Sequence, residues 1–157
     1  FDITRQQLDI GLSRQFLRGR LQLIDGRPAI LLDVSHNDQS LSAMLDYIES
    51  LNISGDVHAV FGALADKRYE TAFAGLKKCM SHWYLCSLEG ARGQSADALK
   101  ETIFSTEELK SGLSSITIFD GPESALVSAK QLANSDDLIV IFGSFHVVGA
   151  IIGDLNE

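Results

Sequence analysis

The sequence predicts an α/β fold: a mostly parallel sheet of about six strands, with helices on both faces and one antiparallel edge strand. Two observations support this prediction. Apolar runs of about five residues recur along the chain, and segments of roughly 10–15 residues with helical spacing of their apolar side chains separate them. Buried parallel strands joined by crossover helices require this alternation, because both faces of such a sheet are covered. We therefore expect one main Rossmann-like domain, the usual number for a chain of 157 residues.

The start of the chain is expected to lie outside this domain. Thr4 and Gln7 have the form of a capping box, and the apolar residues that follow at helical spacing predict a short helix over residues 4–13. A basic connector then leads to Gly19. Residues 20–24 alternate polar and apolar side chains, and the tight turn after them predicts the antiparallel edge strand. The domain is therefore expected to span residues 20–157.

Four strand–helix units and a closing pair follow the edge strand. Continuous apolar runs mark the strands, and apolar side chains three and four residues apart mark the helices. The predicted units are strand 29–34 with helix 38–51, strand 57–61 with helix 68–78, strand 83–87 with helix 95–104, and strand 116–119 with helix 123–133. Strand 138–142 and a helix over about 145–155 complete the series.

Composition and charge exclude several classes of protein. Hydrophobic residues make up 45% of the chain and charged residues 22%, which is typical of a globular protein. The apolar runs are far shorter than the roughly 18 residues that a membrane-spanning helix needs. A net charge of −8 disfavours nucleic acid and anionic membranes as partners, because both would repel it. Cys79 and Cys86 are too few for a disulfide framework and lack metal-ligand spacing, so we expect a reduced, cytoplasmic location.

Ligands of open α/β sheets bind beyond the carboxyl ends of the strands. Five segments of this chain should reach that end of the sheet, namely residues 33–37, 62–67, 87–93, 120–123 and 143–146. Three of them combine Gly with Lys, Arg, Ser or His, residue types that approach phosphates and carboxylates closely. The functional site is therefore expected there.

The polar run Asp33-Val34-Ser35-His36-Asn37 supports several interpretations. Asp33 and His36 could form a metal pair, an acid–base pair, or contacts to the ribose and base of a nucleotide. Alternatively, Asp33 only ends a strand, and Asn37 or Asp38 caps the next helix, a role that these residue types often fill.

A metal site is disfavoured by the positions of the other histidines. His58 and His82 lie near predicted strand starts, at the opposite end of the sheet from His36. His146 is the one remaining histidine that could join His36.

Two further loops place anion-binding residue types after strands. Lys67 closes a Gly-containing loop that opens a helix, so it could reach an anion held by backbone N–H groups. The loop is not a Walker A loop, because the closing Gly-Lys-Ser/Thr is absent. Ser144 and His146 follow Gly143 in a similar position. The alternative for Lys67 is a solvated side chain, and for Ser144 a plain helix N-cap.

Five motifs occur in order along the chain. They are Gly19-Arg20, Asp33-Val34-Ser35-His36-Asn37, Gly62-Ala63-Leu64-Ala65-Asp66-Lys67, Trp83-Tyr84 with Leu88-Glu89-Gly90-Ala91-Arg92-Gly93, and Gly143-Ser144-Phe145-His146. Each motif is weak alone, but the ordered set is specific and covers nearly the whole chain. With it the chain resembles the C-terminal domain of the Mur ligase superfamily, and most closely the bacterial folylpolyglutamate synthase/dihydrofolate synthase branch.

The resemblance implies an ATP-dependent ligase that works with Mg²⁺. A carboxylate of dihydropteroate or of a reduced folate is phosphorylated to an acyl phosphate, which the amine of L-glutamate then attacks. The resemblance implies ATP contacts at Arg20, Asp33, His36 and Asn37, and glutamate contacts at Lys67, Ser144 and His146. These residue types suit the ligands, since a guanidinium pairs well with phosphate, and an ammonium with a hydroxyl pairs well with carboxylate. No residue of this domain is assigned a catalytic or metal-binding role.

The resemblance also implies a second domain. In the family, the P-loop, the Mg²⁺ ligands and a modified active-site lysine lie in an N-terminal domain. Residues 1–19 would be the last helix of that domain and the linker to this one, so a chain that begins with Phe1 is expected to be a fragment that is inactive alone. Departures from the family pattern at Arg18, Ser35, Asp38 and Ala91 leave the implied ligand groups intact.

Two alternatives remain open at this stage. One is the C-terminal domain of a peptidoglycan-precursor Mur ligase, although the segments 83–84 and 88–93 favour the folate branch. The other is a non-catalytic Rossmann-like module that only holds a nucleotide. A Gly-rich P-loop in the sequence upstream would favour a ligase over the module.

Overall fold

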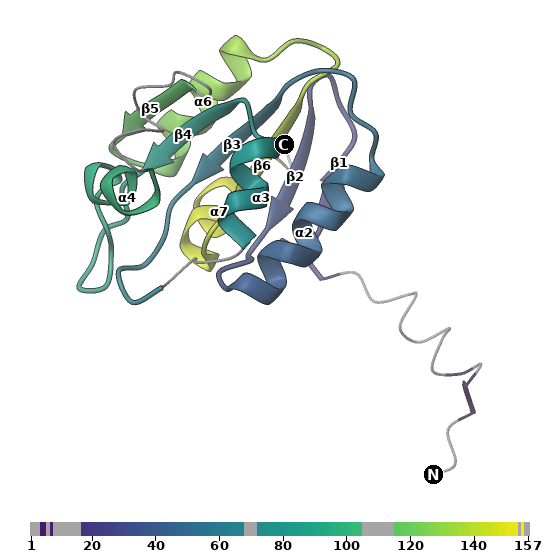
Figure 1. Cartoon of the computed structure of the whole chain (residues 1–157), viewed down its shortest axis with the longest axis horizontal. Helices are drawn as coiled ribbons and strands as arrows, with labels where there is room; N and C mark the ends of the chain where they lie inside the picture. The colour runs from purple at the N-terminus through teal and green to yellow at the C-terminus, as the bar shows by residue number, and fades with distance from the viewer. Residues whose placement is uncertain are drawn as a thin grey trace.

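One mixed sheet organises the residues that the structure, a computed structural model, describes: 4, 5, 7, 17–67, 72–104, 115–153 and 155. Its strands are β1 (Gln22–Ile24), β2 (Ala29–Asp33), β3 (Val57–Phe61), β4 (His82–Cys86), β5 (Ser115–Phe119) and β6 (Leu138–Phe142). They form a six-stranded sheet in the order β1-β2-β6-β3-β4-β5 (Figure 1). β1 runs antiparallel to β2, while the other neighbours are parallel. The predicted α/β fold and its antiparallel edge strand are confirmed.

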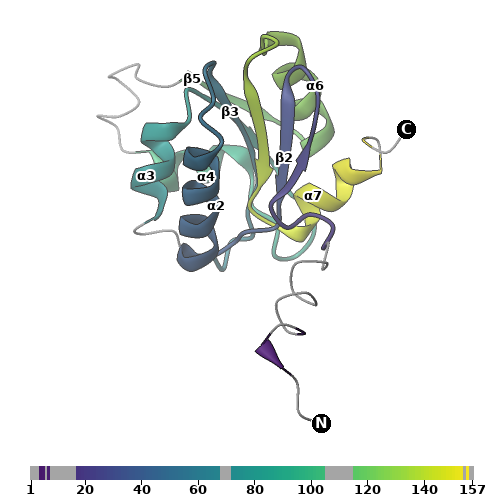
Figure 2. The same cartoon turned by 90° about the vertical axis from the view of Figure 1, so that its right-hand side faces the viewer.

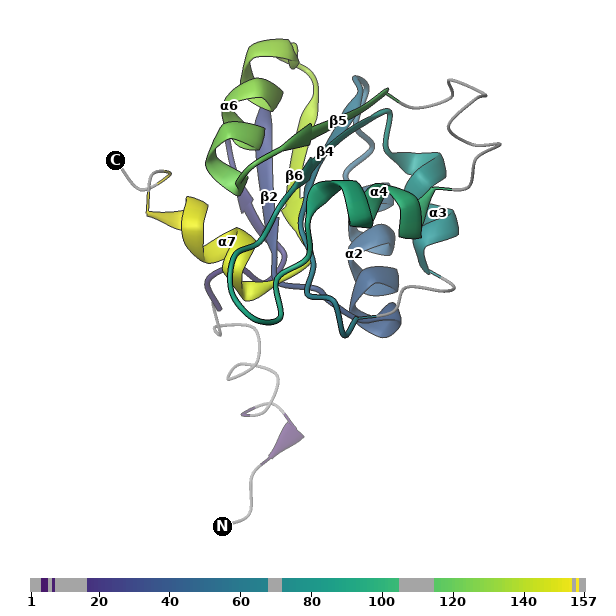
Figure 3. The same ribbon diagram turned by 90° about the vertical axis from the view of Figure 1, so that its left-hand side faces the viewer.

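Helices cover both faces of the sheet. On one face lie α2 (Asp38–Ser50), α3 (Ala72–Cys79) and α4 (Ala96–Ile103), and on the other lie α6 (Pro122–Leu132) and α7 (Phe145–Ile152) (Figures 2 and 3). Each helix turns its apolar side chains to the sheet, as Leu41, Met44 and Ile48 of α2 do. Because successive residues of a strand point to opposite faces, the buried strands supply two separate apolar cores, one under each helix layer.

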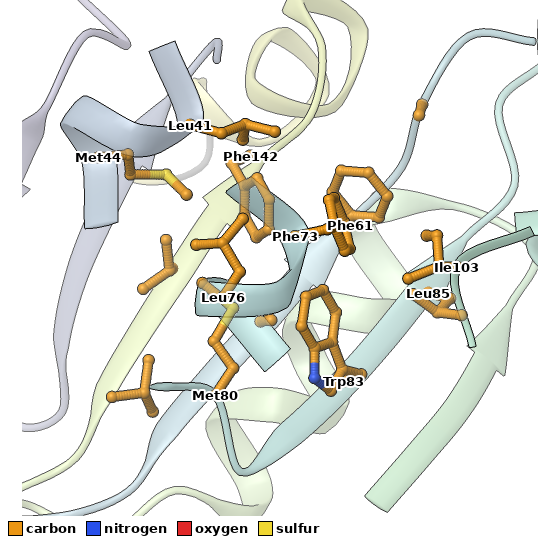
Figure 4. Close-up of a cluster of buried hydrophobic side chains, with 14 of the residues drawn as sticks. Leu41, Met44, Phe61, Phe73, Leu76, Met80, Trp83, Leu85, Ile103 and Phe142 are labelled. Atoms are coloured by element: carbon orange, nitrogen blue, oxygen red, sulfur yellow. The ribbon is translucent and has the colours of Figure 1, made fainter. Parts of the chain in front are cut away.

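The larger core is built around aromatic rings (Figure 4). Trp83 is fully buried, and its ring lies 5.5 Å from that of Phe73 and 5.4 Å from that of Phe104, measured between centroids. Phe61 and Phe142, the last residues of β3 and β6, lie 4.8 Å apart in the same core. Close packing of this kind leaves little freedom to the strand ends, so the loops that follow β3 and β6 start from fixed positions.

Most element boundaries agree with the prediction to within one or two residues, and two differences have clear causes. β4 begins at His82 rather than at residue 83, since His82 pairs with His58 and Ser115 on the neighbouring strands. A polar residue in this place gives no apolar signal. α7 ends at Ile152, short of the expected 155, and Gly153 follows as its C-cap.

Two predicted helices lie partly outside the described residues. In the first, the backbone N–H of Gln7 donates to Thr4 Oγ1 at 3.3 Å, and the backbone N–H of Thr4 donates to Gln7 Oε1 at 3.0 Å, which confirms the capping box. The rest of the helix expected over 4–13 is not described. Of the helix expected over 68–78, residues 68–71 are not described. Within the described part of the chain, no helix is long and apolar enough to span a membrane.

Candidate functional site

The strand order creates a crevice at the carboxyl end of the sheet, where β2, β3, β4 and β6 end. β6 lies between β2 and β3, yet α7 after β6 covers the opposite face from α2 and α3. The chain segments that leave these neighbouring strands therefore diverge and leave an opening between them, as the rule for open α/β sheets describes. A pocket of about 210 Å³ occupies this position, and its lining residues are His36, Leu64, Lys67, Arg92, Gly143, Ser144, Phe145 and His146.

The structure brings together four of the seven residues to which the resemblance assigned a ligand. His36, Lys67, Ser144 and His146 come from the loops after three different strands and share the pocket. Arg20, Asp33 and Asn37 do not line it.

Glycines allow the loops after β3 and β6 to meet. Gly143 has a φ of +111°, and a Cβ at this position would collide with the carbonyl oxygen of Gly62. Gly62 in turn packs against Cys86 and Val147, where a Cβ would lie 2.7 Å and 2.9 Å from their side-chain atoms. Only residues without a Cβ permit this approach without strain, so the backbone itself fixes the distance between the Lys67 loop and α7.

Ser144 is the N-cap of α7. Its Oγ accepts a hydrogen bond of 3.2 Å from the backbone N–H of Val147, so the cap that the sequence allowed as an alternative is confirmed. The cap uses the oxygen as an acceptor, and the hydroxyl proton can still be donated to a ligand. The first turn of α7 carries no acidic residue, which leaves the positive end of the helix dipole open to an anion.

The hydrogen bond of His36 defines which ring nitrogen faces a ligand. Nδ1 lies 3.0 Å from the carbonyl oxygen of Val34. Because a carbonyl only accepts, Nδ1 must carry the proton, and Nε2 is left as the acceptor of the neutral ring. Asn37 beside it caps α2 by accepting from the backbone N–H of Ser40 at 3.0 Å, which confirms its structural alternative.

Asp33 is buried and does not line the pocket. Its carboxylate, in a residue only 4% exposed, accepts 2.8 Å hydrogen bonds from both the backbone N–H and the hydroxyl of Ser35. Burial raises the pKa of Asp33, although the bonds from Ser35, the backbone N–H of Leu21 and the charge of Arg20 oppose this rise. The carboxylate therefore joins the end of β2 to the segment that enters the domain.

That entering segment is docked on α7 and on the end of β2. The carbonyl oxygen of Gly19 accepts a 2.7 Å hydrogen bond from the backbone N–H of Val34. Gly19 has a φ of +70°, and a Cβ there would lie 2.9 Å from Val148 Cγ1. The guanidinium carbon of Arg20 lies 5.9 Å from the ring centroid of Phe145, within range of a cation–π contact.

Phe145 links Arg20 to the pocket. The residue is 60% exposed, and its ring lies 6.3 Å from the ring of His36, measured between centroids. Phe145 was not predicted to contact a ligand, although it stands between Ser144 and His146 in the sequence. One signal in the sequence could have identified Phe145: it is an apolar aromatic residue among polar residues in a motif that begins with Gly and starts a helix.

Arg92 is the second residue that the sequence analysis left without a role. The loop over 88–93 gave a signal, because glycines flank its charged residues. In the structure the Arg92 carbonyl oxygen accepts a 3.0 Å hydrogen bond from the backbone N–H of Ala65, and Leu64 and Gly93 form an isolated antiparallel bridge. The loops that carry Lys67 and Arg92 are thus fastened to each other, and both residues line the pocket, Arg92 as an exposed residue.

The polar groups at the amino end of the sheet, where the parallel strands begin, form a closed network. His58 is 2% exposed, and its Nε2 lies 3.1 Å from Asp137 Oδ2 while its Nδ1 lies 3.1 Å from the hydroxyl of Tyr84. Asp137 also accepts from the backbone N–H groups of Asp56 and Asn134, at 2.8 and 2.6 Å. As predicted, His58 and His82 lie away from His36. Among the described residues, no three His, Cys, Asp or Glu side chains are grouped to hold a metal ion.

Comparison with known proteins places the chain in a family of amino-acid ligases. Residues 19–145 match the family model described as Mur ligase, glutamate ligase domain. A dihydrofolate synthase/folylpolyglutamate synthase of Escherichia coli K12 is 31% identical over 150 residues, which cover 96% of this chain and 33% of that protein.

Two solved structures share the fold over almost the whole chain. E. coli FolC in complex with DHPP and ADP superposes with a TM-score of 0.83 and 28% identity, covering 99% of this chain and 35% of that one. A bifunctional folylpolyglutamate synthase/dihydrofolate synthase with Mn, AMPPNP and L-glutamate bound gives a TM-score of 0.84 and 30% identity, covering 100% and 36%. The chain spans about a third of the length of these relatives. The match over residues 19–145 shows that the chain belongs to the Mur ligase family, as its glutamate ligase domain.

Proposed function

We propose that residues 20–157 are the C-terminal domain of an ATP-dependent ligase that adds L-glutamate to dihydropteroate, to folyl(poly)glutamate, or to both, through an acyl-phosphate intermediate. Residues 1–19 would then be the last helix of an ATP-binding domain and the linker to this one. The observation that carries the proposal is the pocket at the carboxyl end of the sheet, where Lys67 and Ser144 meet. The relatives support the folate branch over the peptidoglycan branch, since those compared are dihydrofolate or folylpolyglutamate synthases.

The pocket suits the carboxylates of the incoming amino acid. Lys67 offers an ammonium group, and its carboxylate neighbour Asp66 is 4.0 Å away, at the outer limit of an ion pair. Ser144 offers a hydroxyl proton at the positive end of α7, and His146, the second residue of that helix, lines the same pocket. Charge-assisted hydrogen bonds of this kind are about twice as strong as neutral ones, so the carboxylates would orient the amine for attack.

The neighbouring surface suits a nucleotide. Arg20 is exposed beside Phe145, where its guanidinium can reach a phosphate that another domain presents. His36 Nε2 can accept from a ribose hydroxyl or from the amino group of a base. Asp33 and Asn37 complete the ATP-facing segment, Asp33 by holding the chain at Leu21 and Ser35, and Asn37 through the amide nitrogen that its cap leaves free.

The reaction divides between the two domains. In the first step a carboxylate oxygen of the pteroate or folate attacks the γ-phosphorus of ATP, and ADP leaves. In the second step the amine nitrogen of glutamate attacks the acyl carbon, phosphate leaves, and the nitrogen loses a proton. Mg²⁺ bound with ATP would neutralise phosphate charge, and its ligands are proposed to lie mainly in the ATP-binding domain. The present domain contributes by positioning glutamate and by excluding water when it closes.

The test uses a full-length protein that carries this domain, with dihydropteroate, ATP and L-glutamate as substrates. Lys67→Met should raise the KM for glutamate by about 10-fold or more and leave the KM for ATP unchanged, because a charged hydrogen bond contributes roughly 1.5–3 kcal/mol. Lys130→Met on α6 is the matched control. If Lys67→Met raised only the KM for ATP, the assignment of Lys67 to glutamate binding would be wrong. Glutamate-dependent ADP release by the 157-residue chain alone would contradict the division between domains.

A further inference from the structure

We propose that Arg92 determines the specificity of this site for a dicarboxylic amino acid. Its guanidinium binds the side-chain carboxylate of the incoming amino acid, while Lys67 and Ser144 bind the α-carboxylate. The inference rests on the proposed function and deepens it, since it adds a residue and a basis for selecting glutamate over neutral amino acids.

The backbone of the surrounding loop holds Arg92 in place. Gly93 N–H donates to the carbonyl oxygen of Gly90 at 3.0 Å, and Leu88 N–H donates to that of Gln94 at 3.0 Å, which closes the loop. Gly93 has no room for a side chain, since a Cβ would overlap the carbonyl oxygen of Leu88. The bond from Ala65 N–H to Arg92 then fixes this loop to the one that carries Lys67. Little backbone ordering therefore remains when a ligand binds.

The pocket carries positive charge. Lys67 and Arg92 both line a volume of about 210 Å³, together with His36 and His146, and none of the described residues that line it is acidic. Within the described part of the chain, no carboxylate forms an ion pair with Arg92. Apart from Asp66 at 4.0 Å from Lys67, the two cations have no carboxylate partner among the described residues, so a ligand with one carboxylate would pair closely with only one of them, whereas a dicarboxylate pairs with both.

The two cations of the pocket differ in the geometry of their donors. Arg92 presents a planar fork that can bind a carboxylate through two parallel hydrogen bonds, whereas Lys67 is a point charge. A fork on a fixed loop distinguishes a carboxylate from an amide, because an amide nitrogen cannot accept either bond. The predicted discrimination is therefore strongest between L-glutamate and L-glutamine, which differ at that group alone.

The experiment compares these two amino acids in the full-length protein. Arg92→Gln should lower kcat/KM for L-glutamate by about 10- to 100-fold, leave kcat/KM for L-glutamine within about 3-fold, and leave the KM for ATP unchanged. Arg92→Lys should restore part of the preference, since it keeps the charge and loses the fork. Arg27→Gln, in the exposed turn between β1 and β2, is the matched control. It should leave kcat/KM unchanged for both L-glutamate and L-glutamine.

Direct binding of L-glutamate, measured by calorimetry on the same proteins, separates the two proposals. Ligation by the parent protein with an unchanged preference in Arg92→Gln would overturn the role of Arg92 and leave the proposed function standing. An equal loss for both amino acids would also overturn it, because it would indicate a general effect on the loop. If L-glutamate binding depends on Arg92 but no ligation occurs, the role of Arg92 in binding would be supported and the proposed ligase function would be overturned. Absence of both binding and ligation would overturn both.

Discussion

At the amino end of the sheet, His58, Asp137 and Tyr84 are buried and bonded to one another. At the carboxyl end, His36, His146 and Lys67 face a pocket. Histidine thus occurs in opposite environments at the two ends of the sheet. A buried polar group must find its partner within the protein, because leaving it unpaired costs roughly 1–3 kcal/mol. A group beside a pocket can keep bonding capacity for a ligand, so a histidine or a carboxylate indicates function only where its bonds are not all taken.

Removing a member of the closed network should give the largest loss of stability. Asp137→Ala would leave His58 and two backbone N–H groups without their acceptor, and loss of one partner of a buried pair costs about 3–5 kcal/mol. Asp136→Ala, at the exposed neighbouring position, is the matched control and should stay within about 0.5 kcal/mol. Urea unfolding of this chain measures both. Equal effects of the two substitutions would show that the network contributes little.

The pH dependence of stability should also originate mainly at the amino end. Burial lowers the pKa of His58 from 6.5, with a further lowering by His82, against the raising effects of Asp137 and Asp56. Below pH 6.5 the unfolded chain therefore binds a proton that the folded protein resists, and stability falls until the pH passes the folded pKa.

Asp137 extends this loss to lower pH. Burial acts to raise its pKa, but the backbone N–H groups of Asn134 and Asp56 and the ring of His58 outweigh burial and lower it from 3.8. Its contribution is therefore lost as the pH falls below 3.8. The free energy of unfolding, measured at intervals between pH 7 and 5, should decline in the parent chain. His58→Gln should flatten this slope, and His146→Gln in the pocket should not. If His146→Gln abolished the slope, the titrating group would lie at the carboxyl end of the sheet, and the assignment to His58 would be wrong.

Asp33 should give the smallest effect, with the opposite sign. Because its pKa is raised above 3.8, its contribution to stability is fully present in acid and is lost as the pH rises through the folded pKa. Asp33→Asn removes the buried charge and keeps an oxygen to accept from Ser35, so at pH 7 it should be as stable as the parent within about 0.5 kcal/mol, or more stable. Thermal unfolding at pH 7 and at pH 4 checks this. A large loss at pH 7 would mean that the ionised carboxylate is as essential here as that of Asp137.

The elements of the fold followed from local patterns. Five-residue apolar runs such as 138–142 identified the buried strands, and helical spacing at Leu41, Met44 and Ile48 identified α2. The alternation in residues 20–24 identified the antiparallel edge strand. The prediction began β4 at residue 83 and missed His82, because the polar His82 is part of the strand through its pairing with His58, a contact between distant parts of the chain.

The sequence also predicts which residues are of types that bind anions or nucleotides, but it does not predict which of them lie together. His36, Lys67, Ser144 and His146 were identified by their residue types and their places after strands. Whether they meet depends on the order of the strands, and that order places β6 between β2 and β3. All three are apolar runs of similar length, so side-chain patterns do not distinguish their positions in the sheet.

The sequence alone therefore determined which segments become strands and helices, and which residue types stand at the strand ends, because these depend on spacing along the chain. The tertiary structure decided which loops face one another. It brought Arg92 and Phe145 to the pocket, buried Asp33 away from it, and bonded His58 to Asp137. The reason is physical: a polar group's role depends on whether folding gives it a partner, and that partner lies far away in the sequence.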